Sequence, residues 1–160
     1  MQKRQEEQEK EKEVSEFWLM PPKMKILEAL GTIADERIKV KGSKATVQSS
    51  MHEKAYSVTF DEKKKAIMSN DNGSFYKGYL GYPSIAFLMV KGILPYDKDI
   101  AESLRDIKWK ELNEKFKNYF KVEIIIKAIA ARKGVKQNYI DEFVAKVLKE
   151  IEKLKLKKLE

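Results

Sequence analysis

The spacing of apolar residues changes along the chain, and each spacing predicts a different kind of element. Between residues 23 and 35 apolar residues recur every three or four positions, which is typical of an amphipathic helix. Pro21 and Pro22 stand directly before this segment, and proline suits the first turn of a helix. The sequence therefore predicts a helix whose buried stripe comprises Met24, Leu27, Leu30, Ile33 and Ala34.

Four short segments then alternate apolar and polar residues, as half-buried strands do. They read "RIKVKG", "KATVQSS", "AYSVTFD" and "KAIMS", and turn-forming residues separate them. A shift of register by one residue would expose the whole apolar face, so the alternation fixes the register. The sequence predicts an antiparallel meander of three or four strands with a buried face that includes Ile38, Val40, Tyr56, Val58 and Phe60.

From Pro83 onward the pattern is helical again. A helix that carries Ile85 to Met89 is expected to end at Gly92, and Asp97 is expected to cap the next one. Further helical segments are predicted at 108–120, 122–134 and 138–159. The predicted fold class is α+β: an N-terminal helix and a small antiparallel β-meander, together a ββα-like core, followed by four or five α-helices.

Composition divides the chain and limits its chemistry. Residues 1–16 are rich in Lys and Glu and offer almost nothing to bury, so we expect a charged arm that is disordered or a frayed helix. Residues 17–160 are expected to form one domain, with the core at 23–92 and a helical extension at 97–160. The chain has no cysteine, which excludes disulfides, thiolate metal sites and cysteine nucleophiles.

The charge pattern bears on partners and location. No apolar run is long enough to span a membrane and no signal peptide is apparent, so we expect a cytoplasmic protein with no membrane partner. The Lys- and Glu-rich composition is typical of thermophiles. The net charge is +8, and most of it comes from residues 119–160, whose eleven Lys and Arg face six Asp and Glu. Such an excess attracts phosphate-bearing partners, although a solvated lysine surface gives the same numbers.

The order of these segments resembles the SWIM zinc-finger module over about residues 23–92. A helix is followed by "ERIKVKGSKATVQSS", "KAYSVTF", a strand ending in an Asp-bearing turn, and a helix with "IAFLMVKG". In that family a Cys-x-Cys pair and a Cys-x-His pair bind zinc. The resemblance places Ile67 and Ser69 at the first pair of ligand positions, and Tyr82 and Ser84 at the second.

None of these four residues is a usual zinc ligand, so the resemblance implies a metal-free module without a cofactor. A structural zinc contributes roughly 10 kcal/mol or more to folding, whereas burying Ile67 and Tyr82 returns about 1.5 to 3 kcal/mol each. Two side chains cannot replace the metal. We therefore expect the C-terminal helices to pack onto the core and supply the missing burial.

The connection from Ile67 to Phe87 gathers turn residues and aromatic rings. "SNDNGS" is similar to the start of a calcium-binding loop, but Met68 and Tyr79 would occupy ligand positions, so a strand-terminating turn is favoured. The rings can stack on the bases of a single strand while lysine meets phosphate, or they can fold inward over the sheet. The sequence favours packing with one or two rings exposed, and the candidates for nucleic-acid contact are Tyr76, Lys77 and Tyr79.

Residues 126–145 resemble a helix-turn-helix, with Gly134 in the turn. That resemblance would bring Lys136, Gln137 and Asn138 to a DNA major groove, whereas an ordinary helical hairpin would use Gly134 only to end a helix. The last predicted helix has an apolar seam that can dock on the domain, which is favoured, or pair with a second copy. Its opposite face carries Lys146, Lys149 and Lys153, which we expect to contact phosphate or to be solvated.

The predicted function is a non-catalytic nucleic-acid-binding or regulatory module that uses this basic C-terminal face, with DNA or RNA as partner. The alternative is a protein-interaction or scaffold module that binds a protein partner, or a second copy through the C-terminal helix, and does not bind nucleic acid. An enzyme ranks third, because no cysteine or well-placed histidine supports nucleophilic or general-base chemistry and no catalytic residue can be named.

Overall fold

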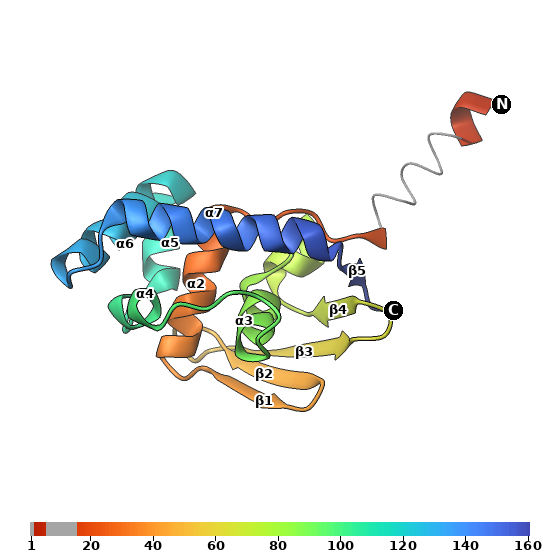
Figure 1. Ribbon diagram of the computed structural model, residues 1–160, viewed down its shortest axis with the longest axis horizontal. Coiled ribbons are helices and arrows are strands. Elements are labelled where there is room, and N and C mark those ends of the chain that lie inside the picture. The colour runs from red at the N-terminus through yellow and green to blue at the C-terminus, as the bar shows by residue number, and fades with distance from the viewer. Residues whose placement is uncertain (1, 6–15) are drawn as a thin grey trace.

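The computed structural model describes residues 2–5 and 16–160 and has an α+β fold, in which helices cover one face of a mixed five-stranded sheet (Figure 1). The strand order is β1-β2-β3-β4-β5, with β5 parallel to β4 and the other pairs antiparallel. The strands are β1 (Ile38–Lys41), β2 (Lys44–Gln48), β3 (Ala55–Asp61), β4 (Ala66–Ser69) and β5 (Lys157–Lys158). The predicted fold class and the antiparallel meander, expected to have three or four strands, are confirmed, with four strands in the meander. The predicted arm falls mainly on residue 1 and residues 6–15, outside the described residues.

The helices form a layer around one central member. The π-helical turn η1 (Gly73–Lys77) connects β4 to α3 (Tyr82–Val90), which packs on the sheet. On α3 lies α2 (Lys23–Ala34), which α4 and α7 contact in turn. The remaining helices are α4 (Lys98–Ser103), α5 (Trp109–Phe116), α6 (Tyr119–Arg132) and α7 (Gln137–Leu154). Because α2 has neighbours on several sides, it buries more of its surface than one amphipathic stripe requires.

The last helix docks on the domain, as the sequence favours. Its apolar seam, Ile140, Val144, Val147 and Ile151, is buried in the same core as α2 and α3. Burial of four branched residues contributes about 1.5 to 3 kcal/mol each before ordering costs. The seam is therefore occupied within the chain, and the helix turns its lysines outward.

The boundaries predicted for the helices at 108–120, 122–134 and 138–159 are partly wrong. The segment 108–120 is not continuous, because Lys117 adopts a left-handed conformation with φ +48° and ends α5. Asn118 then begins α6, its side-chain oxygen accepting hydrogen bonds from the backbone N–H groups of Phe120 and Lys121. The helix predicted at 138–159 ends at Leu154, where Lys155 is left-handed with φ +46°, and β5 follows.

Segments near the two ends of the continuous range 16–160 meet beside β4. The indole N–H of Trp18 donates to the carbonyl of Ile67 at 2.8 Å, and the backbone N–H of Trp18 donates to Leu156 at 3.1 Å. Leu19 forms a bridge with Tyr79. The segment that precedes α2 thus belongs to the fold. Among residues 2–5 and 16–160, no helix combines the length and the apolar character needed to cross a membrane.

Gly31 marks the closest approach between α2 and α5. A Cβ atom at Gly31 would lie 2.9 Å from Nε1 of the buried Trp109 indole. We expect Gly31→Ala to lower the free energy of unfolding by about 1–3 kcal/mol, because overpacking outweighs the better helix propensity of alanine. Urea unfolding measures the change. The matched control is the same substitution in a Trp109→Leu background, where the cost should shrink; stabilisation of the wild-type background by Gly31→Ala would contradict the packing.

Candidate functional site

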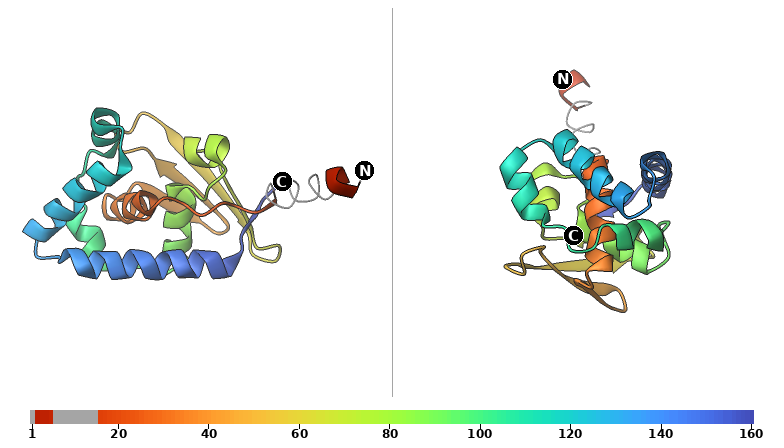
Figure 2. Two further views of the ribbon diagram at one scale, coloured as in Figure 1. Left: turned by 90° about the horizontal axis from the view of Figure 1, so that it is seen from above. Right: turned by 90° about the vertical axis from the view of Figure 1, so that its left-hand side faces the viewer.

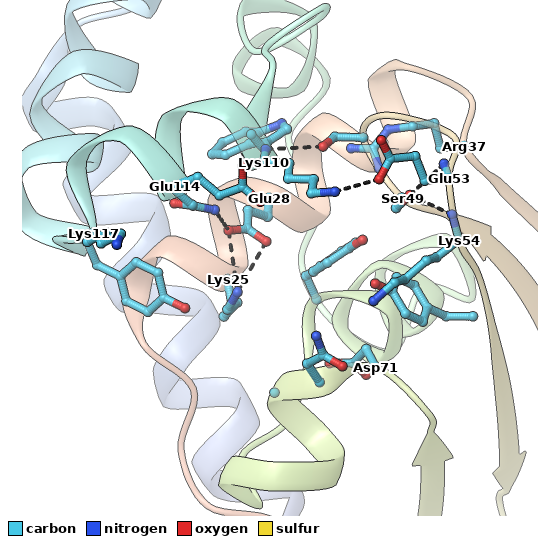
Figure 3. A pocket seen from close by; sticks show the side chains of 18 residues that line it. Lys25, Glu28, Arg37, Ser49, Glu53, Lys54, Asp71, Lys110, Glu114 and Lys117 are labelled. Carbon is cyan, nitrogen blue, oxygen red and sulfur yellow. Dashed lines mark hydrogen bonds and ion pairs between the residues drawn. The ribbon is translucent and has the colours of Figure 1, made fainter.

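A pocket of about 630 Å³ opens between α2, α5, the β2–β3 loop and the turn after β4 (Figure 3). Its lining is rich in charge and aromatic rings. The cations are Lys25, Arg37, Lys54, Lys110 and Lys117; the carboxylates are Glu28, Glu53, Asp71 and Glu114; the rings are Tyr56, Tyr82, Trp109 and Tyr119. These residues come from segments that are remote in sequence and that the fold brings together around one cavity.

One wall of the pocket is a nearly buried ion pair on α2. Lys25 and Glu28 are one helical turn apart, with Nζ 3.3 Å from the carboxylate and side-chain exposures of 12% and 5%. The Asn113 amide of α5 also donates to Glu28, at 3.1 Å. Burial alone would lower the pKa of Lys25, but Glu28 and the neighbouring Tyr119 and Tyr79 raise it above its ordinary value. Lys25 is therefore a charged donor at neutral pH.

A second ion pair joins α5 to the β2–β3 loop above the cavity. The Lys110 ammonium contacts the Glu53 carboxylate, and the Lys110 backbone N–H donates to Ser50 Oγ at 3.2 Å. The hydrogen bond with Lys110 lowers the pKa of Glu53, and the same bond raises the pKa of Lys110. Both side chains are exposed, so the pair contributes little to stability. It does occupy one acceptor atom of Glu53, Oε2.

The wall near the sheet holds a buried guanidinium. Arg37 is 4% exposed and donates from Nη1 to the carbonyl of Gln48 at 2.8 Å, while its Nε lies 3.6 Å from an Asp35 carboxylate oxygen. Tyr82 and Tyr56 pack edge to face with ring centroids 6.3 Å apart. Burial foremost raises the pKa of both phenols, so they remain neutral donors at neutral pH.

The lower wall is formed by Asp71, which is 4% exposed. Its Oδ1 accepts from the hydroxyl groups of Ser69 and Ser74 at 2.6 and 2.7 Å, and its Oδ2 accepts from the Ser74 N–H at 3.2 Å. Gly81 lies against the carboxylate, since a Cβ there would come within 2.2 Å of Oδ2. Asp71 thus holds the start of η1 and the start of α3 together.

Comparison with known proteins assigns the chain to a family. A family model described as uncharacterised conserved protein UCP014422 matches residues 18–157. The chain belongs to this family. No curated protein and no solved structure matches it. All the pocket residues lie within the range that the UCP014422 model matches.

In this member of the UCP014422 family, some aromatic residues of the connection from Ile67 to Phe87 are exposed and others are packed against the protein. Phe75 and Tyr76 on η1 expose 74% and 75% of their surface, and their rings meet edge to face with centroids 4.9 Å apart. Lys77 follows them and is exposed. Tyr79 is half-buried against Gly73, and burial foremost raises the pKa of its phenol to about 12. The expectation that one or two rings stay exposed is confirmed.

The predicted basic residues of the last helix are exposed but lie elsewhere. Figure 2 shows α7 and η1 on opposite sides of α2, in both views. The sequence-predicted contact residues therefore form two separate surfaces. One carries Tyr76 and Lys77; the other carries Lys136, Gln137, Asn138, Lys146, Lys149 and Lys153.

The α6–α7 hairpin that resembles a helix-turn-helix is tied by a buried cation. Lys127 on α6 contacts Glu123 on its own helix, at 2.7 Å, and Asp141 on α7. Gly134 has φ +90° in the turn, which only glycine adopts readily. Lys136, Gln137 and Asn138 lie at the start of α7 and are exposed.

The four residues at zinc-ligand positions of the SWIM resemblance lie where β4 meets α3. Ile67, Ser69 and Ser84 are buried and Tyr82 is half-buried. Within the described part of the chain, no cluster of three or more His, Asp or Glu residues has a metal-binding arrangement. Sequence reasoning missed most of the pocket. One signal was available: Glu28 interrupts the apolar stretch of α2, where an unpaired charge would be costly.

Proposed function

We propose that the protein is a non-catalytic module that binds single-stranded nucleic acid on the face formed by η1 and the pocket. The observation that carries the proposal is the exposed Phe75–Tyr76 pair beside Lys77. Two adjacent rings in water are an unusual use of apolar surface, and bases stack on such rings whatever their sequence. Lysine beside them supplies the phosphate contact that a strand also needs.

Neighbouring charges support this face. The Lys158 ammonium lies beside Gly78 at the end of η1, 3.6 Å from where a Cβ would stand. Lys54 and Lys117 also line the pocket, as does Gly73, the first residue of η1, and the two lysines lie at opposite sides of the cavity in Figure 3. Lysines therefore flank the ring pair and continue into the pocket. That arrangement favours a strand that runs from the rings toward the cavity.

The basic face of α7 is a weaker candidate for the same role. Its lysines alternate with the exposed carboxylates of Glu142 and Glu152, and Lys153 pairs with Glu150 at 3.4 Å. Mixed charge lowers the number of counterions that a bound phosphate chain would release. We therefore place the main contact on the η1 face and treat α7 as the comparison surface.

Anisotropy of labelled single-stranded DNA and RNA, measured with the whole chain, tests the proposal. We expect affinity that falls steeply between about 50 and 200 mM salt. Phe75→Ala with Tyr76→Ala should weaken binding about tenfold or more, because each stacked base contributes about 1–3 kcal/mol. Since both rings are exposed, the melting temperature should hardly change.

The matched control is Lys146→Ala with Lys149→Ala on α7, which should have a small effect. No binding at low salt would refute the function. Loss of binding in the α7 variant, with the ring variant unchanged, would refute the assignment to the η1 face.

A protein-interaction module is the second candidate, favoured by a different observation. Phe120 and Ile124 on α6 are one turn apart and expose 70% and 51% of their surface. A protein partner would bury such an apolar pair. This function would be favoured by a stable dimer in light scattering together with the absence of salt-dependent oligonucleotide binding. The dimer should then be lost in the variant that combines Phe120→Ser with Ile124→Ser.

A further inference from the structure

We propose that the pocket between α2, α5 and the β2–β3 loop binds a nucleoside phosphate, either free or as one unit of a strand. The strand-bound form rests on the proposed function, whereas the free nucleotide does not. The volume suits this ligand class, because pockets for small molecules measure about 300–1,000 Å³ and this one is about 630 Å³.

Three of the four carboxylates in the pocket already accept hydrogen bonds from the protein, and the fourth, Glu114, forms no ion pair within the described residues. Glu28 already accepts from Lys25 and Asn113, and Glu53 from Lys110. Asp71 accepts three internal hydrogen bonds. Three of the four carboxylates are thus engaged by groups of the protein itself. A ligand that contacts the lysines left without a carboxylate partner must bring its own acceptors.

The donors that remain are cationic. Within residues 2–5 and 16–160, neither Lys54 nor Lys117 forms an ion pair, and both are exposed at the pocket. Arg37 is nearly fully buried, is paired with Asp35, and lines the pocket on the side opposite Lys117. Lys54 and Arg37 lie on the same side of the cavity in Figure 3. A phosphate group supplies the acceptors and the negative charge that would pair with Lys54.

The other side of the pocket offers a ring. Tyr119, the first residue of α6, exposes 41% of its surface, and the Lys25 ammonium lies 5.2 Å from its ring centroid. Lys25 polarises that ring, and the exposed part is open to a planar partner. A phosphate on the Lys54 side and a base on the Tyr119 side require a molecule that carries both, as a nucleotide does.

Calorimetric titration of the whole chain with AMP, adenosine and inorganic phosphate tests the inference. We expect AMP to bind more tightly than either fragment. Lys54→Gln should weaken AMP about tenfold and leave adenosine unchanged, because a charge-assisted contact to phosphate is lost. Tyr119→Ala should weaken AMP and adenosine alike, about tenfold, while Tyr119→Phe retains both.

Oligonucleotide titrations separate this inference from the proposed function. Phe75→Ala with Tyr76→Ala should leave AMP affinity unchanged and weaken a strand. AMP binding that depends on Lys54 and Tyr119, without any strand binding, would uphold the pocket inference for a free nucleotide and refute the proposed function. No AMP binding, together with strand affinity that is indifferent to Lys54→Gln and Tyr119→Ala, would overturn the pocket inference and leave the proposed function standing.

Discussion

Replacing Glu28 with alanine should lower the free energy of unfolding by about 3–5 kcal/mol, which is the usual cost of removing one member of a buried ion pair. The substitution would leave the Lys25 ammonium without its carboxylate and the Asn113 amide without its acceptor. Most of the cost comes from these desolvated donors, since alanine itself suits a helix. Urea unfolding followed by circular dichroism measures the loss.

Two matched variants separate charge from packing at this site. Glu28→Gln keeps an acceptor for Asn113 but removes the charge, so it should cost less than alanine. Lys25→Met with Glu28→Leu removes both charges and should recover the part of the loss that comes from Lys25, because apolar replacements of buried pairs are often neutral. The Asn113 amide still lacks its acceptor in this variant. Equal losses for Glu28→Ala and for the double variant would show that the ion pair is not the cause.

The pKa of Lys25 determines the pH range over which the Lys25–Glu28 ion pair stabilises the fold. It is raised above 10.5, so the folded state holds the Lys25 proton more tightly than the unfolded chain does. The stabilisation is therefore complete below about that pH and is lost as the pH rises further. The comparison of variants belongs at neutral pH, where Lys25 is charged in both states.

Asp71→Ala is expected to cost about 3 kcal/mol or more, since three buried donors lose their acceptor at once. These donors are the hydroxyl groups of Ser69 and Ser74 and the N–H of Ser74. The cavity left beside Gly81 adds to the loss. Thermal unfolding measures it, and Asp71→Asn, which keeps the shape and one acceptor oxygen, should cost less.

Asp71→Ala should also disturb the geometry of the Phe75–Tyr76 ring pair. Asp71 binds the first turn of η1 through Ser74, and its backbone carbonyl accepts from the N–H of Phe75 at 2.9 Å. Loosening that turn removes the fixed geometry of Phe75 and Tyr76. We expect Asp71→Ala to weaken single-strand binding at temperatures where the protein remains folded, whereas Gly31→Ala should not. Unchanged binding in the Asp71→Ala protein would show that η1 keeps its geometry without this carboxylate.

Several strands, helix caps and helix faces can be predicted from the pattern of apolar and polar residues within short stretches of sequence. Alternating residues predict β1 to β4, because one face of each strand must be buried and the other must not. The side chain of Asp97 accepts from the N–H of Ile100 at 2.9 Å, as its position before an apolar helical segment indicates. The docking of α7 likewise follows from its regular seam. Each of these features is encoded within a short stretch of sequence.

Features that depend on distant partners could not be predicted in this way. Two lysines in β5 have no strand pattern, and they become a strand because β4 offers its edge. Lys117 adopts a left-handed conformation, which its residue type does not predict. The pocket joins Glu28 with Asn113 and Lys110 with Glu53, pairs separated by 85 and 57 positions. Only the fold shows that these charges share a cavity.

The two edges of the sheet differ in how open they are to pairing with a strand of another molecule. At one edge of the sheet, the short strand β5 covers β4 by pairing with it in parallel. At β1 the outer edge is open within the described sheet, and the strand carries the exposed Lys39 and Lys41. Lysines on an edge strand resist the approach of a second strand, because pairing would bring like charges together. A concentrated solution should therefore be protected against edge-to-edge aggregation by two side chains that have no part in the pocket or the rings.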